Sequence, residues 1–425
     1  MCVASSERST DHHGLRPNPR RWAWSYGSPR LIGCLVVSVA LLPAGGHTAR
    51  RVTTNSEAAP RLMWTMQIPA PRRESVRSPA RLGRAAAGTL PVLLDDLSTI
   101  VAIRVDTGTQ AWRRNAASEH LHASDDERFY LGSSGLGAGG KLEPRFRVLD
   151  AITGNELWSS LSSSSNYVAA GGGRVAWIAH DQTVHCADAR TGRILWRLPG
   201  AAPGTMTREI ALLTVDPEDA RRPLGMRAAF VNPATGERLK TFTIDDTLAT
   251  GYDAKFLLTR KPELLLVSEI RAGVGFESYN INAFRSDGTL AWHAPELSGT
   301  TIASGTVVGM WWRNGIHYKH LGVRAVSMRN GKPLWTRRHG RDRSSYPVGA
   351  WGPAVLILDA KPYGKTRMQD RILALDARSG RQRWRISGPA DAAAVSGPWL
   401  IVLYDDVKRK RVTLRGYRFR SRGRG

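Results

Sequence analysis

A short motif recurs seven times along this chain and constrains its fold more than any other feature of the sequence. Each copy combines an apolar run, a small polar residue and a Gly, and six of the seven copies carry a Trp four residues after that Gly. The glycines lie 38 to 52 residues apart and are Gly108, Gly154, Gly192, Gly236, Gly288, Gly331 and Gly380. The tryptophans are Trp112, Trp158, Trp196, Trp292, Trp335 and Trp384. A repeat of this length holds four short strands, which is typical of one blade of a β-propeller.

The copy around Gly192 shows why these residue types recur. Val184 and Cys186 alternate with His185 before the turn, and Trp196 continues the period of two after it, which predicts a β-hairpin. Gly supplies the positive φ that a tight turn needs, and the Asp before it can bond to the backbone of the turn. We expect the Trp to pack between neighbouring blades, because a single blade cannot bury its own faces.

The two ends of the chain determine the number of blades. The stretches Ala394–Tyr404 and Val412–Phe419 supply three strands without a further turn motif, and Trp64 lies 48 residues before Trp112. We therefore expect the strand around Leu62–Ile68 to pair with the C-terminal strands in one sheet, which would close the ring without an open edge. The sequence predicts eight blades, with seven as the alternative.

Two copies, FRVLDAITGNELW at Phe146–Trp158 and ILALDARSGRQRW at Ile372–Trp384, resemble the repeats of pyrroloquinoline quinone (PQQ)-like propellers. This family includes quinoprotein dehydrogenases and non-catalytic relatives such as the outer-membrane assembly lipoprotein. The resemblance covers about residues 60–420 and implies an all-β, eight-bladed PQQ-like β-propeller. The WD40 repeat family fits less well, because its Trp-Asp pair is missing and Trp here follows the turn glycine.

The first 60 residues have the composition of a targeting segment. Arginines precede the apolar run Leu31–Leu42, and small residues follow it at Pro43–Gly46, as in a signal peptide. The run is shorter than the roughly 20 residues of a spanning helix, which favours a signal peptide, and an uncleaved membrane anchor is the alternative. We expect a signal peptide or membrane anchor at 1–46, a linker at 47–60, the propeller at 61–420 and a basic tail at 421–425. The protein is thus expected to be extracytoplasmic, either secreted or anchored to a membrane.

The formal net charge of +25 arises from 61 Lys and Arg against 36 Asp and Glu. The C-terminal stretch Lys408–Arg424 holds nine basic residues and no acidic residue. Its first four residues, Lys408, Arg409, Lys410 and Arg411, are candidates for contact with an anionic surface, because basic side chains bind anionic lipids. A solvated hairpin turn is the alternative. Nucleic acid is not an expected partner, because export separates the protein from the usual nucleic-acid targets and the sequence shows no recognised nucleic-acid-binding module.

Catalytic chemistry has little support in the sequence. The resemblance implies that active quinoprotein dehydrogenases carry a disulfide between adjacent cysteines, a calcium ion and an Asp base. No two of the three cysteines here are adjacent, and Cys186 is expected to be a buried apolar residue. Met310–Trp312 departs from the repeat and is a candidate for an exposed aromatic contact, with packing in the core as the default. We predict no catalytic residue and no metal site.

The sequence therefore favours an exported, non-enzymatic PQQ-like propeller that acts as a binding or scaffold module at the cell envelope. Its expected partner is an envelope protein or an anionic surface polymer, its N-terminal segment could associate with the membrane, and the chain is expected to be a monomer. No cofactor is predicted. The alternative is a PQQ- and calcium-dependent dehydrogenase of alcohols or sugars.

Overall fold

The structure, a computed structural model, describes residues 59–69, 80–94, 99–115, 119–133, 144–162, 168–215, 226–244, 255–260, 263–273, 276–313, 319–340, 343–360, 370–406 and 409–420. The chain divides into two compact units, residues 1–34 and 35–425. The first unit and the apolar run Leu31–Leu42 lie outside the described residues. Within the ranges given, no helix is long and apolar enough to cross a membrane.

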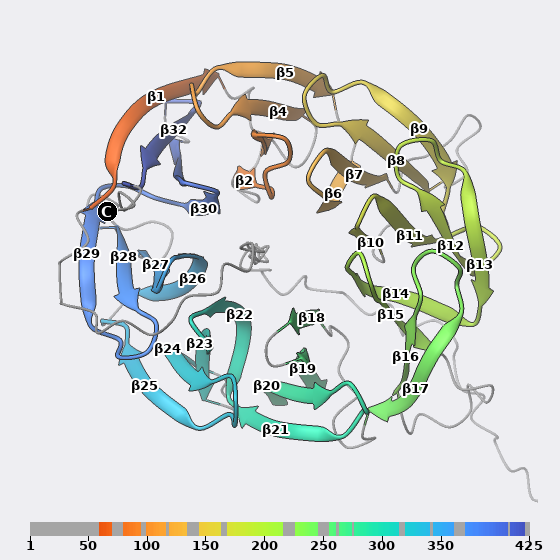
Figure 1. Cartoon of the computed structure of the whole chain (residues 1–425). Helices are drawn as coiled ribbons and strands as arrows, with labels where there is room; N and C mark the ends of the chain where they lie inside the picture. The colour runs from red at the N-terminus through yellow and green to blue at the C-terminus, as the bar shows by residue number, and fades with distance from the viewer. Residues whose placement is uncertain are drawn as a thin grey trace, which may run out of the picture. The chain divides into compact units, whose positions relative to one another are not determined.

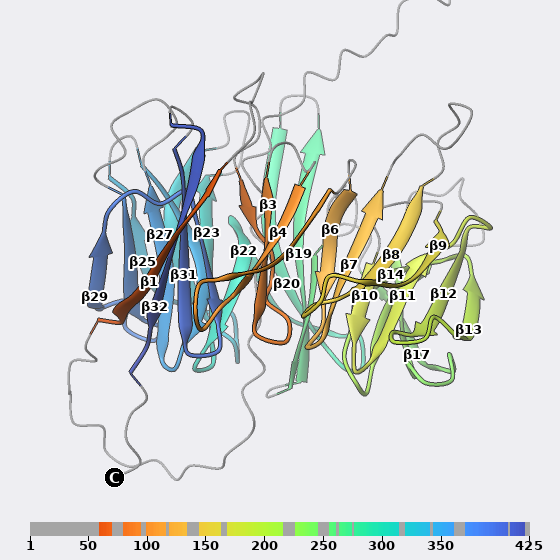
Figure 2. The same cartoon turned by 90° about the horizontal axis from the view of Figure 1, so that it is seen from above.

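The second unit consists of eight antiparallel four-stranded sheets arranged in a ring (Figure 1). The first strand of each sheet lies nearest the centre, and the last strand lies on the rim. In the view turned by 90°, the strands run across the thickness of the ring (Figure 2). The prediction of an eight-bladed β-propeller is confirmed.

Blades 1 to 4 follow the chain in order. Blade 1 contains β2 (Arg81–Leu82), β3 (Thr89–Leu94), β4 (Thr99–Arg104) and β5 (Gln110–Asn115). Blade 2 contains β6 (Glu119–Ser124), β7 (Arg128–Ser133), β8 (Arg145–Asp150) and β9 (Glu156–Leu161). Blade 3 contains β10 (Val168–Gly171), β11 (Arg174–Ile178), β12 (Thr183–Asp188) and β13 (Ile194–Pro199). Blade 4 contains β14 (Ala201–Met206), β15 (Ala211–Val215), β16 (Met226–Val231) and β17 (Arg238–Ile244).

Blades 5 to 8 complete the ring. Blade 5 contains β18 (Lys255–Arg260), β19 (Glu263–Gly273), β20 (Phe276–Arg285) and β21 (Leu290–Pro295). Blade 6 contains β22 (Leu297–Ala303), β23 (Thr306–Arg313), β24 (Lys319–Ser327) and β25 (Pro333–Arg338). Blade 7 contains β26 (Ser344–Trp351), β27 (Ala354–Ala360), β28 (Arg371–Asp376) and β29 (Gln382–Ser387). Blade 8 contains β30 (Ala392–Ser396), β31 (Trp399–Asp406), β32 (Arg411–Arg418) and β1 (Arg61–Pro69).

Blade 8 closes the ring by pairing the two ends of the propeller. Strand β1 pairs antiparallel with β32 from Arg61 opposite Arg418 to Pro69 opposite Arg411. The predicted closure by the strand around Leu62–Ile68 is therefore confirmed, and it sets the number of blades at eight rather than seven.

The hydrophobic core lies between the blades. Eight clusters of buried side chains each combine residues from two neighbouring sheets, one cluster at each contact between blades. The second and third strands of a blade are covered on both faces, so that all six residues of β3 are buried. The outer strands bury only one face, and β9 alternates between exposed and half-buried residues.

Candidate functional site

The repeated Gly and Trp residues meet across the contacts between blades. The turn between the third and fourth strand of one blade carries the Gly, and the Trp on the outer strand of the preceding blade lies against it. A Cβ atom added at Gly154 would lie 2.5 Å from the Trp112 ring, and one added at Gly192 would lie 2.8 Å from the Trp158 ring. The φ angles at the seven turn glycines lie between +68° and +83°. Gly is thus required both by the left-handed backbone and by the approach of the indole.

The indole N–H of each such Trp donates a hydrogen bond to the neighbouring turn. Trp112 Nε1 donates to the carbonyl oxygen of Ala151 at 3.0 Å, and Trp158 Nε1 donates to that of Ala189 at 3.0 Å. The same bond recurs at four more blade contacts, from Trp64 to Val105, Trp196 to Pro233, Trp292 to Met328 and Trp335 to Ala377. In all six cases the accepting carbonyl belongs to the residue three positions before the turn Gly.

Two contacts between blades differ from this pattern. In blade 4, Lys240 takes the Trp position and pairs with Phe230, so that the ring against Gly288 comes from Phe242, two residues further along β17. At the contact between blades 7 and 8, Trp384 packs against Phe419, with the ring centroids 6.1 Å apart. Blade 8 has no equivalent turn, because its third and fourth strands come from opposite ends of the propeller.

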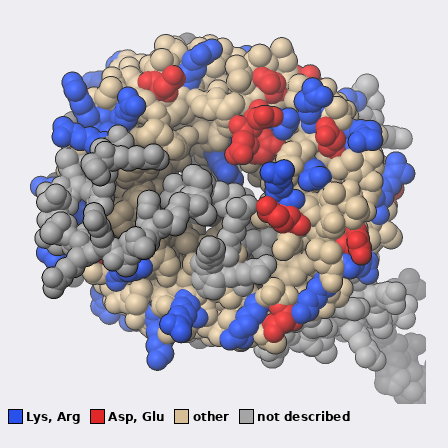
Figure 3. Space-filling view, in the orientation of Figure 1, with Lys and Arg blue, Asp and Glu red and all other residues tan. Residues whose placement is uncertain are grey.

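Of the four basic residues predicted to contact an anionic surface, Arg409 and Lys410 lie in the turn that precedes β32, and Arg411 is the first residue of that strand. Lys408 lies outside the described residues. Arg409 keeps 70% of its side chain exposed and lies 3.8 Å from the Asp406 carboxylate, whereas Arg411 Nη1 donates to Gln67 Oε1 of β1 at 2.9 Å. Arg409 and Lys410 are exposed, and Figure 3 shows further basic side chains around the rim of the ring.

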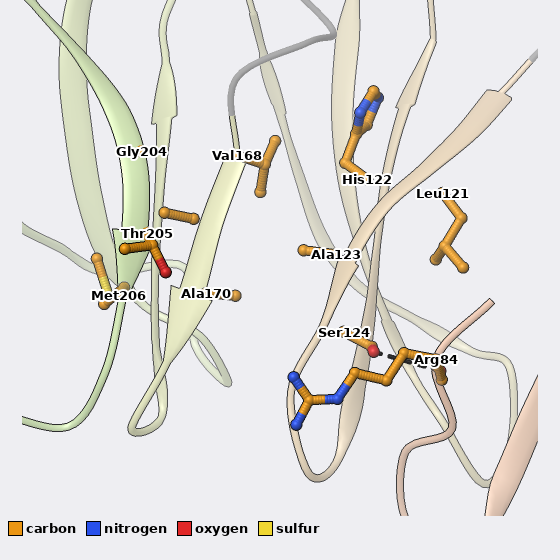
Figure 4. A pocket seen from close by; sticks show the side chains of 11 residues that line it. Arg84, Leu121, His122, Ala123, Ser124, Val168, Ala170, Gly204, Thr205 and Met206 are labelled. Carbon is orange, nitrogen blue, oxygen red and sulfur yellow. Dashed lines mark hydrogen bonds between the residues drawn. The ribbon is translucent and has the colours of Figure 1, made fainter. Parts of the chain in front are cut away.

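A small cavity opens between the innermost strands of blades 2, 3 and 4. Its volume is about 180 Å³, and it is lined from β6, β10, β14 and the segment after β2 by Arg84, Leu121, His122, Ala123, Ser124, Val168, Ala169, Ala170, Gly204, Thr205 and Met206 (Figure 4). Ser124 Oγ donates to the carbonyl oxygen of Arg84 at 3.2 Å. A guanidinium group, an imidazole and two hydroxyl groups thus share a space that suits a small polar or anionic group.

This cavity does not fit PQQ together with calcium. Pockets for ligands of that size measure roughly 300–1,000 Å³, and a calcium ion needs several oxygen ligands, usually with carboxylates among them. None of the residues that line the cavity is acidic. Across the part of the chain that the structure describes, no group of three or more His, Cys, Asp or Glu could hold a metal ion.

Asp125 is a structural carboxylate that closes the turn between β6 and β7. It accepts hydrogen bonds from the backbone N–H groups of Glu127 and Arg128, each at 2.8 Å, and from the Tyr130 hydroxyl at 2.6 Å. Burial, followed by the charge of Asp125, raises the pKa of Tyr130. Because its oxygens are occupied by these donors, Asp125 is positioned to cap the turn rather than to act as a general base.

An aromatic cluster joins blades 5, 6 and 7. The rings of Tyr279 and Trp312 stack with their centroids 4.3 Å apart, and His320 lies 4.9 Å from Trp312, 5.1 Å from His339 and 5.5 Å from Tyr346. His320 Nε2 donates to the carbonyl oxygen of Gly322 at 2.8 Å. Burial and the charge of His339 lower the pKa of His320 to about 4, so that this ring is neutral at pH 7. Sequence reasoning named Trp312 but not its partners, because the members of the cluster are up to 67 residues apart.

The other candidate residues lie in packed positions. Trp312 is buried, and Trp311 lies under the guanidinium group of Arg324, 4.5 Å from its ring centroid. The Cys186 thiol is fully buried at the contact between blades 3 and 4, and burial raises its pKa to about 12. A thiol with such a pKa stays protonated and is a poor nucleophile.

In a comparison with protein families, residues 96–251 match a family described as outer membrane protein assembly factor BamB. A comparison with curated protein sequences gives no match.

Several solved structures resemble the fold. BamB from Moraxella catarrhalis aligns with a TM-score of 0.50 at 14% identity, covering 84% of this chain and 99% of that one. The C-terminal WD40 domain of Sif2 gives a TM-score of 0.51 at 8% identity, covering 86% and 100%. The quinohemoprotein alcohol dehydrogenase ADHIIG from Pseudomonas putida HK5 gives 0.47 at 11% identity, covering 84% and 76%. At these identities the likeness concerns the fold alone.

Proposed function

From the premise that this chain is a PQQ-like repeat β-propeller, we propose that it is an exported, non-enzymatic binding or scaffold module that works at the cell envelope. Its partner is an envelope protein, the protein is a monomer, and it uses no cofactor. The observation that carries the proposal is the match of residues 96–251 to a family described as an outer membrane assembly factor. The signal-like segment before residue 47 supports export.

The geometry of the contacts between blades and of the inner wall agrees with this proposal. The repeated Trp and Gly residues are engaged in contacts between blades, where they stabilise the ring and are not presented to a ligand. The cavity between β6, β10 and β14 accommodates a protruding side chain of a partner protein better than a PQQ molecule. Side chains that suit such an insertion are acidic or polar ones, because Arg84 and two hydroxyl groups line the cavity.

The proposal is tested by localisation and cross-linking of the full chain in the organism that encodes it. A tagged chain is followed through cell fractionation, and a photoreactive amino acid replaces either Arg84 in the cavity or Ile152, which is 52% exposed on the outside of blade 2. We expect the chain in the envelope fraction and a cross-link to one envelope protein from the Arg84 position. A cytoplasmic chain would contradict the proposal.

The dehydrogenase alternative is tested on the same purified chain. PQQ and calcium are added, and dye-linked oxidation of alcohols and sugars is measured together with thermal stability, which rises when a ligand binds the folded state. We expect neither turnover nor a change in the melting temperature. Saturable turnover would replace the scaffold proposal by the dehydrogenase reading.

A further inference from the structure

Charged side chains are distributed unequally around the ring. Among the described residues, Lys and Arg outnumber Asp and Glu by seven to one in blade 6, six to three in blade 7, seven to three in blade 8 and five to one in blade 1. Glu296, which lies between blades 5 and 6, is counted with blade 6. The described residues of these four consecutive blades, here called the basic half, carry a net charge of +17. In blades 2 to 5, called the balanced half, the described residues include fifteen basic and fourteen acidic ones, a net charge of +1.

The difference is larger at the surface. In the basic half, fifteen Lys and Arg are exposed, and Asp106 is the single exposed acid among the described residues. Three acids of this half, Asp359, Asp370 and Asp405, are buried at 2% exposure each, and Asp359 is held between Arg343 and Arg371. Among the residues of the balanced half whose exposure the structure describes, eight exposed basic residues stand against seven exposed acids. On the face shown in Figure 3, acidic side chains gather over the right of the ring, where Figure 1 places blades 2 and 3.

The basic residues do not converge on a pocket. They lie on outer strands, such as Arg113 of β5 and Arg385 of β29, and on turns, such as Arg378 and Arg381 between β28 and β29. Charges spread over four blades match a broad anionic surface rather than a small ligand, and an attraction of this kind acts within about 10 Å at 0.1 M salt.

The point at which the chain enters the propeller lies in this half. Strand β1 begins at Arg61 in blade 8, and the next two residues, Leu62 and Met63, are 48% and 47% exposed. Eighteen residues separate the end of the apolar run Leu31–Leu42 from Arg61, which corresponds to about 60 Å when the chain is extended. A run retained in a membrane would tether the propeller at blade 8 within reach of the lipid surface, where basic and apolar side chains together favour binding at the interface.

We propose that the basic half docks on the anionic headgroups of a phospholipid bilayer. The inference rests on the proposed function at the cell envelope and assigns the membrane-facing side of the ring. The cavity between β6, β10 and β14 then belongs mainly to the balanced half, which stays available to a protein partner.

Two matched variants of the full chain test the docking surface. One replaces Arg329, Lys332, Arg378 and Arg381 of the basic half by Ser, and the other replaces Arg190, Arg193, Arg208 and Arg238 of the balanced half by Ser. Each variant removes four exposed positive charges, most of them from equivalent turns. Co-sedimentation is measured with vesicles of phosphatidylcholine alone and with vesicles that also contain phosphatidylglycerol, and melting temperatures verify that both variants fold.

We expect the wild-type chain to bind the anionic vesicles more tightly than the neutral ones and to lose this preference at high salt. The basic-half variant should lose at least about tenfold in affinity for the anionic vesicles, whereas the balanced-half variant should keep wild-type affinity within about twofold. Equal losses in both variants would overturn the proposal, and so would equal binding to neutral vesicles. A preference for a soluble anionic polymer or an acidic protein over the vesicles would assign the surface to that partner instead.

The vesicle result is independent of the cell fractionation that tests the function. If the basic-half variant binds vesicles like the wild type but the chain remains in the envelope fraction with its cross-linked partner, the docking surface is wrong and the scaffold function stands. If the wild-type chain is cytoplasmic, the function fails whatever the vesicles show.

Discussion

Each turn glycine of the repeat meets two separate requirements, a left-handed backbone and space for an indole ring. Gly154 has a φ of +72°, and a Cβ atom there would overlap the Trp112 ring. Gly88 has nearly the same φ, +73°, but no atom lies within 4 Å of an added Cβ. The two positions therefore separate the cost of the backbone conformation from the cost of the overlap.

We expect Gly88→Ala to lower the free energy of unfolding by about 1 kcal/mol, the cost of a left-handed residue with a side chain. Gly154→Ala should lower the free energy of unfolding by about 1–3 kcal/mol more than Gly88→Ala, because the Trp112 indole must move. Urea unfolding followed by tryptophan fluorescence measures both. Equal losses in the two variants would show that the approach of Trp112 does not matter.

His320 makes stability depend on pH. Its pKa is about 4 in the folded chain, mainly because it is buried, and 6.5 is its ordinary value. Between these two pH values the unfolded chain takes up a proton at this histidine that the folded chain does not. The free energy of unfolding therefore falls as the pH falls from 6.5 to about 4, and His320 contributes no further decline below that pH. The total loss amounts to up to about 3 kcal/mol.

Unfolding free energies measured from pH 7 to pH 4 check this expectation. His320→Gln should lack this part of the decline, whereas His180→Gln, at an exposed histidine, should keep it. A wild-type slope in the His320 variant would place the acid sensitivity elsewhere.

At the scale of elements, the outer strand of one blade is bound to the turn of the next. The contact uses one ring and one hydrogen bond, and the register of the outer pair shifts beside the Trp in every blade that has one, as at Ala102 and Ile103 opposite Trp112 and Gln110. In blade 8, β1 makes the same contact from the other end of the chain, with Trp64 Nε1 2.9 Å from the carbonyl oxygen of Val105.

Trp64→Ala should therefore weaken ring closure. Loss of the ring and its hydrogen bond is expected to cost about 3–5 kcal/mol, because the space between blades 8 and 1 cannot collapse completely. Met63→Ala, at a side chain that is 47% exposed on the same strand, should stay within about 0.5 kcal/mol of the wild type. Chemical denaturation compares the two, and a similar loss in both would mean that closure does not depend on this contact.

At the scale of the whole molecule, the uneven charge also affects folding. Each exposed Arg in the basic half lies among like charges, and this repulsion opposes the compact state at low salt. The four Arg and Lys substitutions in the basic half should raise the melting temperature in about 10 mM salt, whereas those in the balanced half should leave it unchanged or lower it. The difference should disappear by about 0.5 M salt, where the Debye length falls to a few ångströms. A persistent difference would indicate lost contacts rather than repulsion.

Much of the fold could be predicted because its signals are local. The turn chemistry around Gly192 and the alternation on both sides of it depend on adjacent residues, and the distance from Trp64 to Trp112 indicated the closing strand before the pairing of β1 with β32 was known. Lys240 showed that one copy lacked the Trp. It did not show that Phe242 would replace it, because that depends on the neighbouring blade.

The candidate site was far less predictable. Arg84, His122, Ser124 and Thr205 carry no shared motif, and they meet because the inner strands of several blades converge on the axis of the ring. The cluster around His320 likewise combines strands of three blades.

The sequence by itself determined the repeating β-hairpins, the closed ring and the total positive charge, because turn conformation, strand alternation and composition are properties of neighbouring residues or of the chain as a sum. Only the tertiary structure decided which carbonyl each indole binds, which histidine is buried and which half of the ring carries the charge. These depend on distances between residues far apart in the sequence, and closing the ring is what brings those residues together.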